Sequence, residues 1–388
     1  MLPDRHPRNT SVPDAAQESS MKVGFYGHVR QYHSMKAEVD AVIAEVLESG
    51  EYVMGPTLSR FERELAAYFG MKNAIGVNSG TDALWLVFLA LGIGPGDDVI
   101  TTANTFFATA EAIWFTGAKA VFVDIEPDTC NIDPNRIEAA ITPRTRAIVP
   151  VHLYGQLADM RAVSGIAKHH GLFVVEDCAQ AIGARGDGFA AGESSDAVCT
   201  SFIIQKNLGT FGDGGAVITN REDIVPRIRA LRNHGSLKRS HHSMGYNSRL
   251  DDLHAGILNV KLRRVDEWND RRREIADMYT DGLKETGLAL PIEKPGYRHV
   301  YHLYVIETPE RDDMLQYLND SGVDAKVHYP IPIHRQEGYP WGKPADLDVR
   351  LPLTEKSAAI VISLPMFPEL TQAEVDYVID TCRAWVAR

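Results

Sequence analysis

Residues 172–177 read Leu172-Phe173-Val174-Val175-Glu176-Asp177, an apolar run that closes on two carboxylates. The run scarcely alternates, which is typical of a strand buried on both faces of a parallel sheet. Six further short apolar runs, separated by stretches with helical periodicity, lie at residues 74–77, 98–101, 120–124, 147–152, 197–202 and 215–219. This order predicts an α/β domain with a mainly parallel sheet flanked by helices.

Helical spacing predicts two helices before this sheet, over residues 35–47 and 58–69, and one long helix from Leu250 past Trp268. The remaining sequence has apolar runs at 302–306 and 325–328, a helix near 314–318 and a last helix from Gln372, which predicts a small α+β domain. We expect a large domain over residues 21–265 and a small C-terminal domain over 266–388. A polar, disordered extension is expected over residues 1–20.

Composition excludes several classes of protein. The formal net charge of -12 disfavours nucleic acid or an anionic membrane as a partner. We find no secretory signal and no apolar run near the roughly 20 residues of a membrane span, which favours the cytoplasm. The four cysteines have no metal-ligand or redox spacing, and the histidines lack accompanying ligands, so we expect no metal site and no disulfide framework.

Asp177 ends the strand over residues 172–177, where polar side chains of an open α/β sheet reach the ligand crevice. A carboxylate buried there needs a cationic or hydrogen-bonding partner, such as a protonated pyridine nitrogen. The alternative is a capping Asp at a strand-to-helix turn, which position alone favours.

Lys206 follows three uncharged residues, Ile203-Ile204-Gln205, and precedes a glycine-containing loop. A desolvated lysine has a lowered pKa and becomes a nucleophile toward an aldehyde. The alternative is an ordinary surface lysine.

A helix N-terminus with small hydroxyl residues is a ready phosphate site, and Gly80-Thr81-Asp82 with Ser201 could form one. The same residues are also ordinary helix caps. The loop over residues 212–215 has the spacing of neither a dinucleotide fingerprint nor a P-loop, which disfavours a nicotinamide-dependent epimerase or an ATPase.

The sequence closely resembles the DegT/DnrJ/EryC1/StrS family of sugar aminotransferases, which depend on pyridoxal 5'-phosphate (PLP) and have the aspartate-aminotransferase-like fold. The resemblance runs from about Phe25 to the C-terminal helix. It rests on motifs at residues 79–84, 105–109, 150–155, 176–181, 201–202, 206–209, 212–215 and 247–251.

The resemblance implies a role for each motif residue. Lys206 would form the Schiff base with PLP and then shuttle a proton, Asp177 would keep the ring nitrogen protonated, and Phe106 would stack on the ring. Thr81, Ser201 and the backbone at Gly80 and Asp82 would hold the phosphate, and Gln180 would lie near the ring hydroxyl. Asn247 would reach the phosphate of the neighbouring subunit, which implies a homodimer with shared active sites. His328 and Tyr329 would lie near the sugar, although both could equally be ordinary strand-end residues.

The implied reaction moves an amino group from an amino acid, glutamate by the resemblance, to the ketone of a nucleotide-linked sugar, with pyridoxamine 5'-phosphate (PMP) between the half-reactions. Such reactions serve antibiotic or surface-polysaccharide amino-sugar synthesis. Ile203-Ile204-Gln205 departs from the usual family pattern, which leaves the substrate open. The alternatives are a cyclitol (keto-inositol) aminotransferase and a PLP-binding regulator without turnover.

Overall fold

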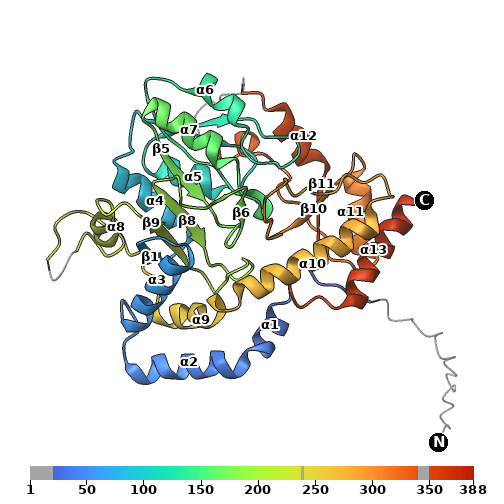
Figure 1. The fold of residues 1–388 in the computed structure, drawn as a ribbon, viewed down its shortest axis with the longest axis horizontal. Helices are drawn as coiled ribbons and strands as arrows, with labels where there is room; N and C mark the ends of the chain where they lie inside the picture. The colour runs from blue at the N-terminus through green and yellow to red at the C-terminus, as the bar shows by residue number, and fades with distance from the viewer. Residues whose placement is uncertain (1–20, 237–239, 340–348) are drawn as a thin grey trace, which may run out of the picture.

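The computed structural model describes residues 21–236, 240–339 and 349–388. The extension expected over residues 1–20 lies outside the described residues. The large domain is built on one seven-stranded sheet in the order β1-β9-β8-β5-β4-β2-β3 (Figure 1). Its strands are β1 (Asn73–Val77), β2 (Asp98–Thr102), β3 (Lys119–Val123), β4 (Thr145–Ile148), β5 (Phe173–Asp177), β8 (Ala197–Ser201) and β9 (Gly215–Thr219).

The sheet is mainly parallel, as the apolar runs predict. Only β9 pairs antiparallel with its neighbours β8 and β1, and the other pairs of neighbouring strands are parallel. Every one of the seven predicted runs forms a strand. The fold is therefore α/β with a mainly parallel sheet, and that prediction is confirmed.

Helices cover both faces of this sheet because alternate strand residues bury their side chains on opposite sides. One face packs against α4 (Gly80–Leu91), α5 (Ala108–Phe115) and α8 (Val225–Leu231). The other packs against α3 (Pro56–Tyr68), α6 (Ile137–Ala140), α7 (Met160–His170) and α9 (Asp252–Leu262). The helices α1 (His28–Ser34) and α2 (Lys36–Ser49) lie beyond α9, which α2 contacts directly.

The long helix predicted from Leu250 is wrong, since the structure has two helices there. α9 ends at Leu262, and α10 (Val265–Leu283) begins after a break at Arg263 and Arg264. The helical pattern continues across the break because α9 is largely buried and α10 buries one face, although the two helices pack against different partners. α9 packs on α2 and α3, whereas α10 runs out to α13 of the small domain (Figure 1).

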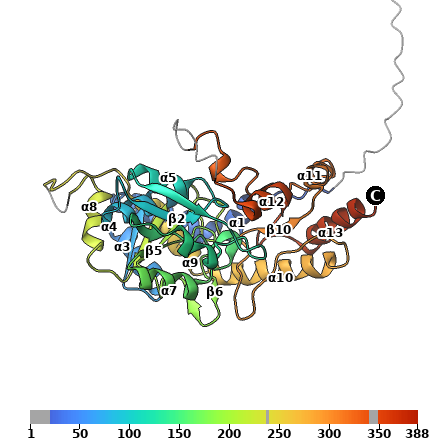
Figure 2. The same ribbon diagram turned by 90° about the horizontal axis from the view of Figure 1, so that it is seen from above.

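The small domain is α+β, as predicted. It contains β10 (Tyr304–Glu307), β11 (Val361–Leu364), α11 (Arg311–Asp320), α12 (Pro352–Ile360) and α13 (Gln372–Val386). Figure 2 shows the small domain beside the large domain, with α10 running from the large domain to the small one. The run at residues 325–328 makes only a single bridge, from Lys326 to Ser363. The exact domain boundary at residues 265/266 stays a prediction.

Short elements complete the fold. A two-stranded ribbon of β6 (Arg185–Gly186) and β7 (Phe189–Ala190) follows β5. Single 3-10 turns lie at Pro134–Arg136, Leu153–Gly155 and Ile333–Arg335. No helix in residues 21–236, 240–339 and 349–388 is both long and apolar enough to cross a membrane.

Candidate active site

A pocket of about 350 Å³ opens at the carboxyl ends of β5 and β8 and is closed on one side by the small domain. This volume falls within the range of small-molecule sites, and its place at the strand ends is where open α/β sheets bind ligands. It is lined by most of the residues singled out in the sequence: Gly80, Thr81, Phe106, Asp177, Gln180, Ser201, Lys206, His328 and Tyr329. These predicted residues are up to 249 positions apart in the sequence, from Gly80 to Tyr329.

Asp177 is the last residue of β5, and its carboxylate is held from two directions. Thr109 Oγ1 donates to Oδ2 at 2.8 Å, and the Ala179 N–H donates to Oδ1 at 3.2 Å. The Thr109 hydroxyl has only one hydrogen, so in its 3.1 Å contact with Thr105 it accepts. Thr105 thus donates to Thr109, which donates to Asp177, so both carboxylate oxygens of Asp177 accept hydrogen bonds.

A second buried network fixes the end of β5 from behind. Ala158 N–H donates to Nδ1 of His152, so Nε2 carries the hydrogen and donates to Glu176 at 2.7 Å. The other Glu176 oxygen accepts from the Gly192 N–H and from Ser195. Every partner of this carboxylate is a donor, so the residue next to Asp177 has little freedom to shift.

Lys206 lies in a loop that leaves β8 and folds back on itself. Phe202 at the loop's start is fully buried and packs edge-on against Phe61, with ring centroids 5.3 Å apart. A Cβ on Gly209 would lie 2.5 Å from the Ile204 carbonyl oxygen, so the tight return requires glycine there.

The Lys206 amine points into the pocket. Within the described residues no hydrogen bond or ion pair uses Nζ, although the side chain is enclosed by protein. Burial lowers its pKa from the usual value to about 8, and the nearby Asp177 carboxylate partly opposes this. With a pKa of about 8, about a tenth of this amine is neutral, and nucleophilic, at pH 7, far more than for an ordinary lysine.

The first turn of α4 forms the far end of the pocket. The Ser79 hydroxyl caps the helix by accepting from the Asp82 N–H at 3.1 Å, which leaves the N–H groups of Gly80 and Thr81 for a ligand. A Cβ on Gly80 would lie 2.8 Å from that of Ser201, so glycine allows the helix start and the end of β8 to approach. The arrangement suits a bound phosphate.

Gln180, Tyr329 and Phe106 form the wall between the two domains. Gln180 Oε1 accepts from the Tyr154 N–H at 2.7 Å, and its Nε2 donates to the Tyr329 hydroxyl at 3.0 Å. Burial raises the pKa of Tyr329, so the phenol keeps its hydrogen and can donate it into the pocket. Phe106 is 58% exposed, with its ring 6.0 Å from that of Tyr329, and it offers a free aromatic face.

Two predicted residues lie outside this pocket. The Asp82 carboxylate accepts a hydrogen bond from the Ser248 hydroxyl at 2.6 Å. The Asp82 N–H already donates to the Ser79 hydroxyl. Asn247 is exposed, next to Tyr246, on the loop between α8 and α9. Asn247 does not reach the pocket of its own chain.

Among the pocket residues that the sequence did not reveal are Tyr26, Thr105 and His302. The sequence analysis also missed Thr109, although the spacing of Thr105 and Thr109 inside a quoted motif was a usable signal. Tyr26 and His302 come from the N-terminal segment and the small domain, and no local pattern marks either. In the described part of the chain, no group of three or more His, Cys, Asp or Glu side chains could hold a metal ion.

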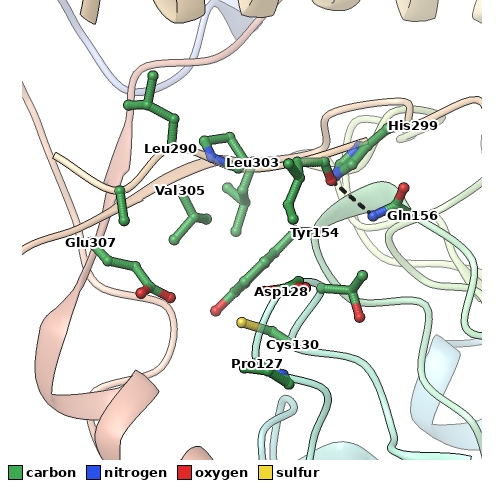
Figure 3. Close-up of a pocket in the computed structure, with 14 residues that line it drawn as sticks. Pro127, Asp128, Cys130, Tyr154, Gln156, Leu290, His299, Leu303, Val305 and Glu307 are labelled. Atoms are coloured by element: carbon green, nitrogen blue, oxygen red, sulfur yellow. Dashed lines mark hydrogen bonds between the residues drawn. The ribbon is translucent and has the colours of Figure 1, made fainter. Parts of the chain in front are cut away.

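A second cavity of about 140 Å³ lies behind the wall formed by Tyr154 and Leu303. Figure 3 shows the Tyr154 hydroxyl, the Cys130 thiol and the Glu307 carboxylate converging at one end of it. No Lys or Arg lines it. The cavity is thus unsuited to a phosphate. The Tyr154 hydroxyl donates a hydrogen bond to the His328 carbonyl, so Tyr154 supports the wall of the pocket that contains Lys206.

The model of the DegT/DnrJ/EryC1/StrS aminotransferase family matches residues 33–383. The chain belongs to this family. It is therefore a PLP-dependent aminotransferase.

Two relatives of this family member cover nearly its whole length. It is 44% identical to dTDP-3-amino-3,4,6-trideoxy-alpha-D-glucose transaminase of Streptomyces venezuelae, over 96% of this chain and 99% of the relative. It is 46% identical to a pleiotropic regulatory protein of Geobacillus stearothermophilus, over 90% of this chain and 95% of the relative.

Two solved structures have the same fold as this aminotransferase. That of S. venezuelae DesV in complex with a ketimine intermediate has a TM-score of 0.91 and 45% identity, and covers 95% of this chain and 99% of that one. The structure of ntda from Bacillus subtilis with bound cofactor PMP has a TM-score of 0.89 and 35% identity. It covers 96% of this chain and 86% of that one. The aspartate-aminotransferase-like fold is confirmed.

The pocket residues fit the family's cofactor on features of this structure alone. The Lys206 amine, which has no hydrogen-bond partner in the described residues, suits the cofactor's aldehyde. The Asp177 carboxylate, which accepts hydrogen bonds, suits a protonated ring nitrogen. The start of α4, with two N–H groups available, suits the phosphate. The cofactor supplies an aldehyde and a ring that accepts electrons from the substrate.

The lowered pKa of Lys206 predicts how cofactor capture depends on pH. Only the neutral amine attacks an aldehyde, so the rate at which cofactor-free protein takes up PLP should rise as pH approaches about 8 and level off above it. Stopped-flow absorbance at a series of pH values measures this. A rate still rising tenfold per unit at pH 9.5 would mean that the amine has an ordinary lysine pKa near 10.4.

Proposed function

We propose that this aminotransferase takes an amino group from an amino acid, glutamate in the simplest case, and passes it to the ketone of a nucleotide-linked sugar. The relative from Streptomyces venezuelae, named as a dTDP-amino-sugar transaminase, supports the substrate class because it aligns with 96% of this chain. Amino-sugar synthesis for an antibiotic or a surface polysaccharide is the corresponding role.

One observation carries the proposal. The Lys206 amine and the Asp177 carboxylate line one pocket, and Asp177 is close enough to affect the pKa of Lys206. In this proposal Lys206 holds the cofactor and afterwards moves a proton at the substrate carbon. Asp177 holds the ring-nitrogen proton, and Gly80, Thr81 and Ser201 bind the phosphate.

The remaining wall residues orient the ligand. Phe106 would cover one face of the ring, Gln180 would lie near the ring hydroxyl, and the Tyr329 hydroxyl and His328 would face the sugar. Burial and the charge of Lys206 lower the pKa of His328 to about 4, so this imidazole is neutral when it meets a substrate. A neutral His and an un-ionised Tyr suit sugar hydroxyls rather than a second phosphate.

Direct assay tests the substrate class. The purified protein, loaded with PMP, is mixed with UDP-, dTDP- and GDP-linked keto sugars and, in parallel, with keto-cyclitols. Conversion of PMP to PLP is followed by absorbance, and the aminated product by mass spectrometry. We expect turnover with at least one nucleotide sugar. Turnover with cyclitols alone would replace the proposal by the cyclitol alternative.

A regulator without turnover is the second candidate, because one relative is named a pleiotropic regulatory protein. The pocket argues against it, since the residues for chemistry are present and enclosed. Formation of PMP from PLP and glutamate distinguishes the two without knowledge of the sugar. A protein that binds PLP yet converts no amino acid tested would support the regulator.

We also propose a homodimer with shared active sites. An aromatic patch of Trp114, Phe115 and Tyr246, exposed by 36–44%, lies beside Asn247. Trp85 joins it, with its ring 4.1 Å from Tyr246 and 5.5 Å from Phe115. Large exposed aromatics are enriched where subunits meet. Asn247 lies outside its own pocket, which leaves it available to a partner's phosphate.

Mixing two inactive variants tests the sharing of sites. If Asn247 serves the partner, a dimer of one Lys206→Ala chain and one Asn247→Ala chain has one complete site. Refolding the two together should restore about a quarter of the wild-type activity at limiting PLP, since about half the dimers are mixed and each has one good site. Each variant refolded alone is the control. No gain on mixing would place Asn247 outside the neighbouring site.

A further inference from the structure

His302 is a pocket residue to which neither the family motifs nor the proposed function gives a role. It precedes β10, is 6% exposed, and lines the same pocket as Lys206. Its ring contacts Asn207, the residue directly after Lys206. The contact therefore joins the small domain to the loop that carries the reactive amine.

A chain of amide contacts fixes which nitrogen of His302 carries hydrogen. Asn269 Nδ2 donates to the Ile182 carbonyl at 2.9 Å, so Asn269 Oδ1 is free to accept from Asn207 Nδ2 at 2.7 Å. Asn207 Nδ2 also donates to the Val300 carbonyl at 3.1 Å. Asn207 Oδ1 must then accept from His302 Nδ1, 3.1 Å away, so Nδ1 bears the hydrogen.

The other ring nitrogen is a permanent acceptor. Burial, together with the positive charges of Lys206 and Arg272, holds the pKa of His302 well below its usual value. The ring is therefore neutral, and Nε2 has a lone pair and no hydrogen. Within the described residues no hydrogen bond uses Nε2, just as none uses Lys206 Nζ.

We propose that in the PMP form, in which the cofactor has left the Lys206 amine, His302 Nε2 accepts a hydrogen bond from that amine and so positions it for proton transfer. The inference rests on the proposed role of Lys206. It makes His302 a positioning residue that acts through Lys206. His328, the other histidine in the pocket, has no such fixed tautomer, because its Nδ1 contacts only the Ser363 hydroxyl, which can donate or accept.

Other ionisable side chains in the pocket could also act on Lys206. These are Asp177, Cys199, Asp213, His328, Tyr26 and Tyr329. Asp177 raises the pKa of Lys206, and His328 is neutral near pH 7. Substitution of His302 leaves all of these side chains in place, so the change in the Lys206 amine is compared between variants that share them.

Two substitutions separate the two edges of the ring. In His302→Asn the side-chain amide can still donate to Asn207, but the acceptor at the Nε2 position is lost. In His302→Gln the longer amide can place an oxygen near the Nε2 position while the contact to Asn207 is weakened. A purely structural role for His302 predicts that the Gln variant is the more impaired, and our proposal predicts the Asn variant.

The measurement uses each holoenzyme in its PMP form, in which the Lys206 amine is free. Reductive methylation over a pH series, read by peptide mass spectrometry, gives the pKa of Lys206 without turnover. Loss of an acceptor disfavours the ammonium form, so His302→Asn should lower the measured pKa of Lys206 by roughly one unit relative to the unsubstituted enzyme, and His302→Gln by less than half of that. In steady state, kcat of the Asn variant should fall about tenfold with KM little changed.

An unchanged Lys206 pKa in a folded His302→Asn variant would overturn the proposal. A raised sugar KM with the Lys206 pKa unchanged would also overturn it, because His302 would then contact the substrate instead. If the Asn variant fails to fold, ¹⁵N-histidine NMR of the unsubstituted PMP form decides instead. We expect His302 Nε2 to carry no hydrogen, and we expect its chemical shift to change in the Lys206→Ala variant. Labelling needs no keto sugar, so a wrong substrate class leaves this test intact.

Discussion

Lys206→Ala should lower kcat/KM for amino transfer by at least about 10³-fold, because it removes both the nucleophile and the proton carrier. The visible absorbance band of lysine-bound cofactor should also disappear while PLP stays bound through the phosphate site. The amine makes no hydrogen bond within the described residues, so its loss should leave the protein folded. Absorbance spectra and steady-state kinetics measure both effects.

Lys206→Arg is the matched control. It keeps a positive charge in the pocket but cannot form a Schiff base, so it should be as inactive as the alanine variant. Lys261 is a second buried lysine, whose Nζ donates to the Gly209 carbonyl at 2.6 Å. Lys261→Met should keep the visible band. A band that survives in Lys206→Ala would show that another amine holds the cofactor.

Asp177→Asn should have the second-largest effect, a fall in kcat of about 10²–10³-fold. The amide has the shape of the carboxylate and can still accept from Thr109, but it cannot hold a proton on the ring nitrogen. The ring then accepts electrons poorly, so removal of the substrate proton slows. Single-turnover conversion of PLP to PMP with an amino acid isolates this step.

Thr109→Val is the graded comparison for Asp177. It removes one hydrogen bond to the carboxylate and keeps the side-chain shape, so kcat should fall only about tenfold. Asp177→Glu should recover part of the activity of Asp177→Asn if the charge matters. Equal rates for Asp177→Asn and the wild-type enzyme would mean that the ring nitrogen needs no acid partner.

The sheet could be predicted from the sequence because its strands are buried. Runs such as residues 74–77 and 172–177 are apolar without alternation, and each forms the strand expected of it. The break between α9 and α10 could not be predicted. Apolar residues continue on both sides of Arg263 because α9 is almost wholly buried and α10 buries one face, so only the change of packing partner marks the turn.

The strand-end residues of the site were predictable for a related reason. Asp177 ends one buried strand and Lys206 lies in the loop just after its neighbour, and the carboxyl ends of neighbouring strands lie together in the sheet. His302 was not predictable in the same way. Its place in the pocket depends on how the small domain packs against the loop after Lys206, and its hydrogen-bonding role depends on three amide contacts from separate segments.

The central claim is that Lys206 is the amine that holds the cofactor. Borohydride reduction of the PLP-loaded protein makes that bond permanent, and peptide mass spectrometry then locates the added group. We predict that the pyridoxyl phosphate mass is found on the peptide containing Lys206 and on no other. Its presence on a different lysine, or its absence from every peptide of a protein that binds PLP, would contradict the account.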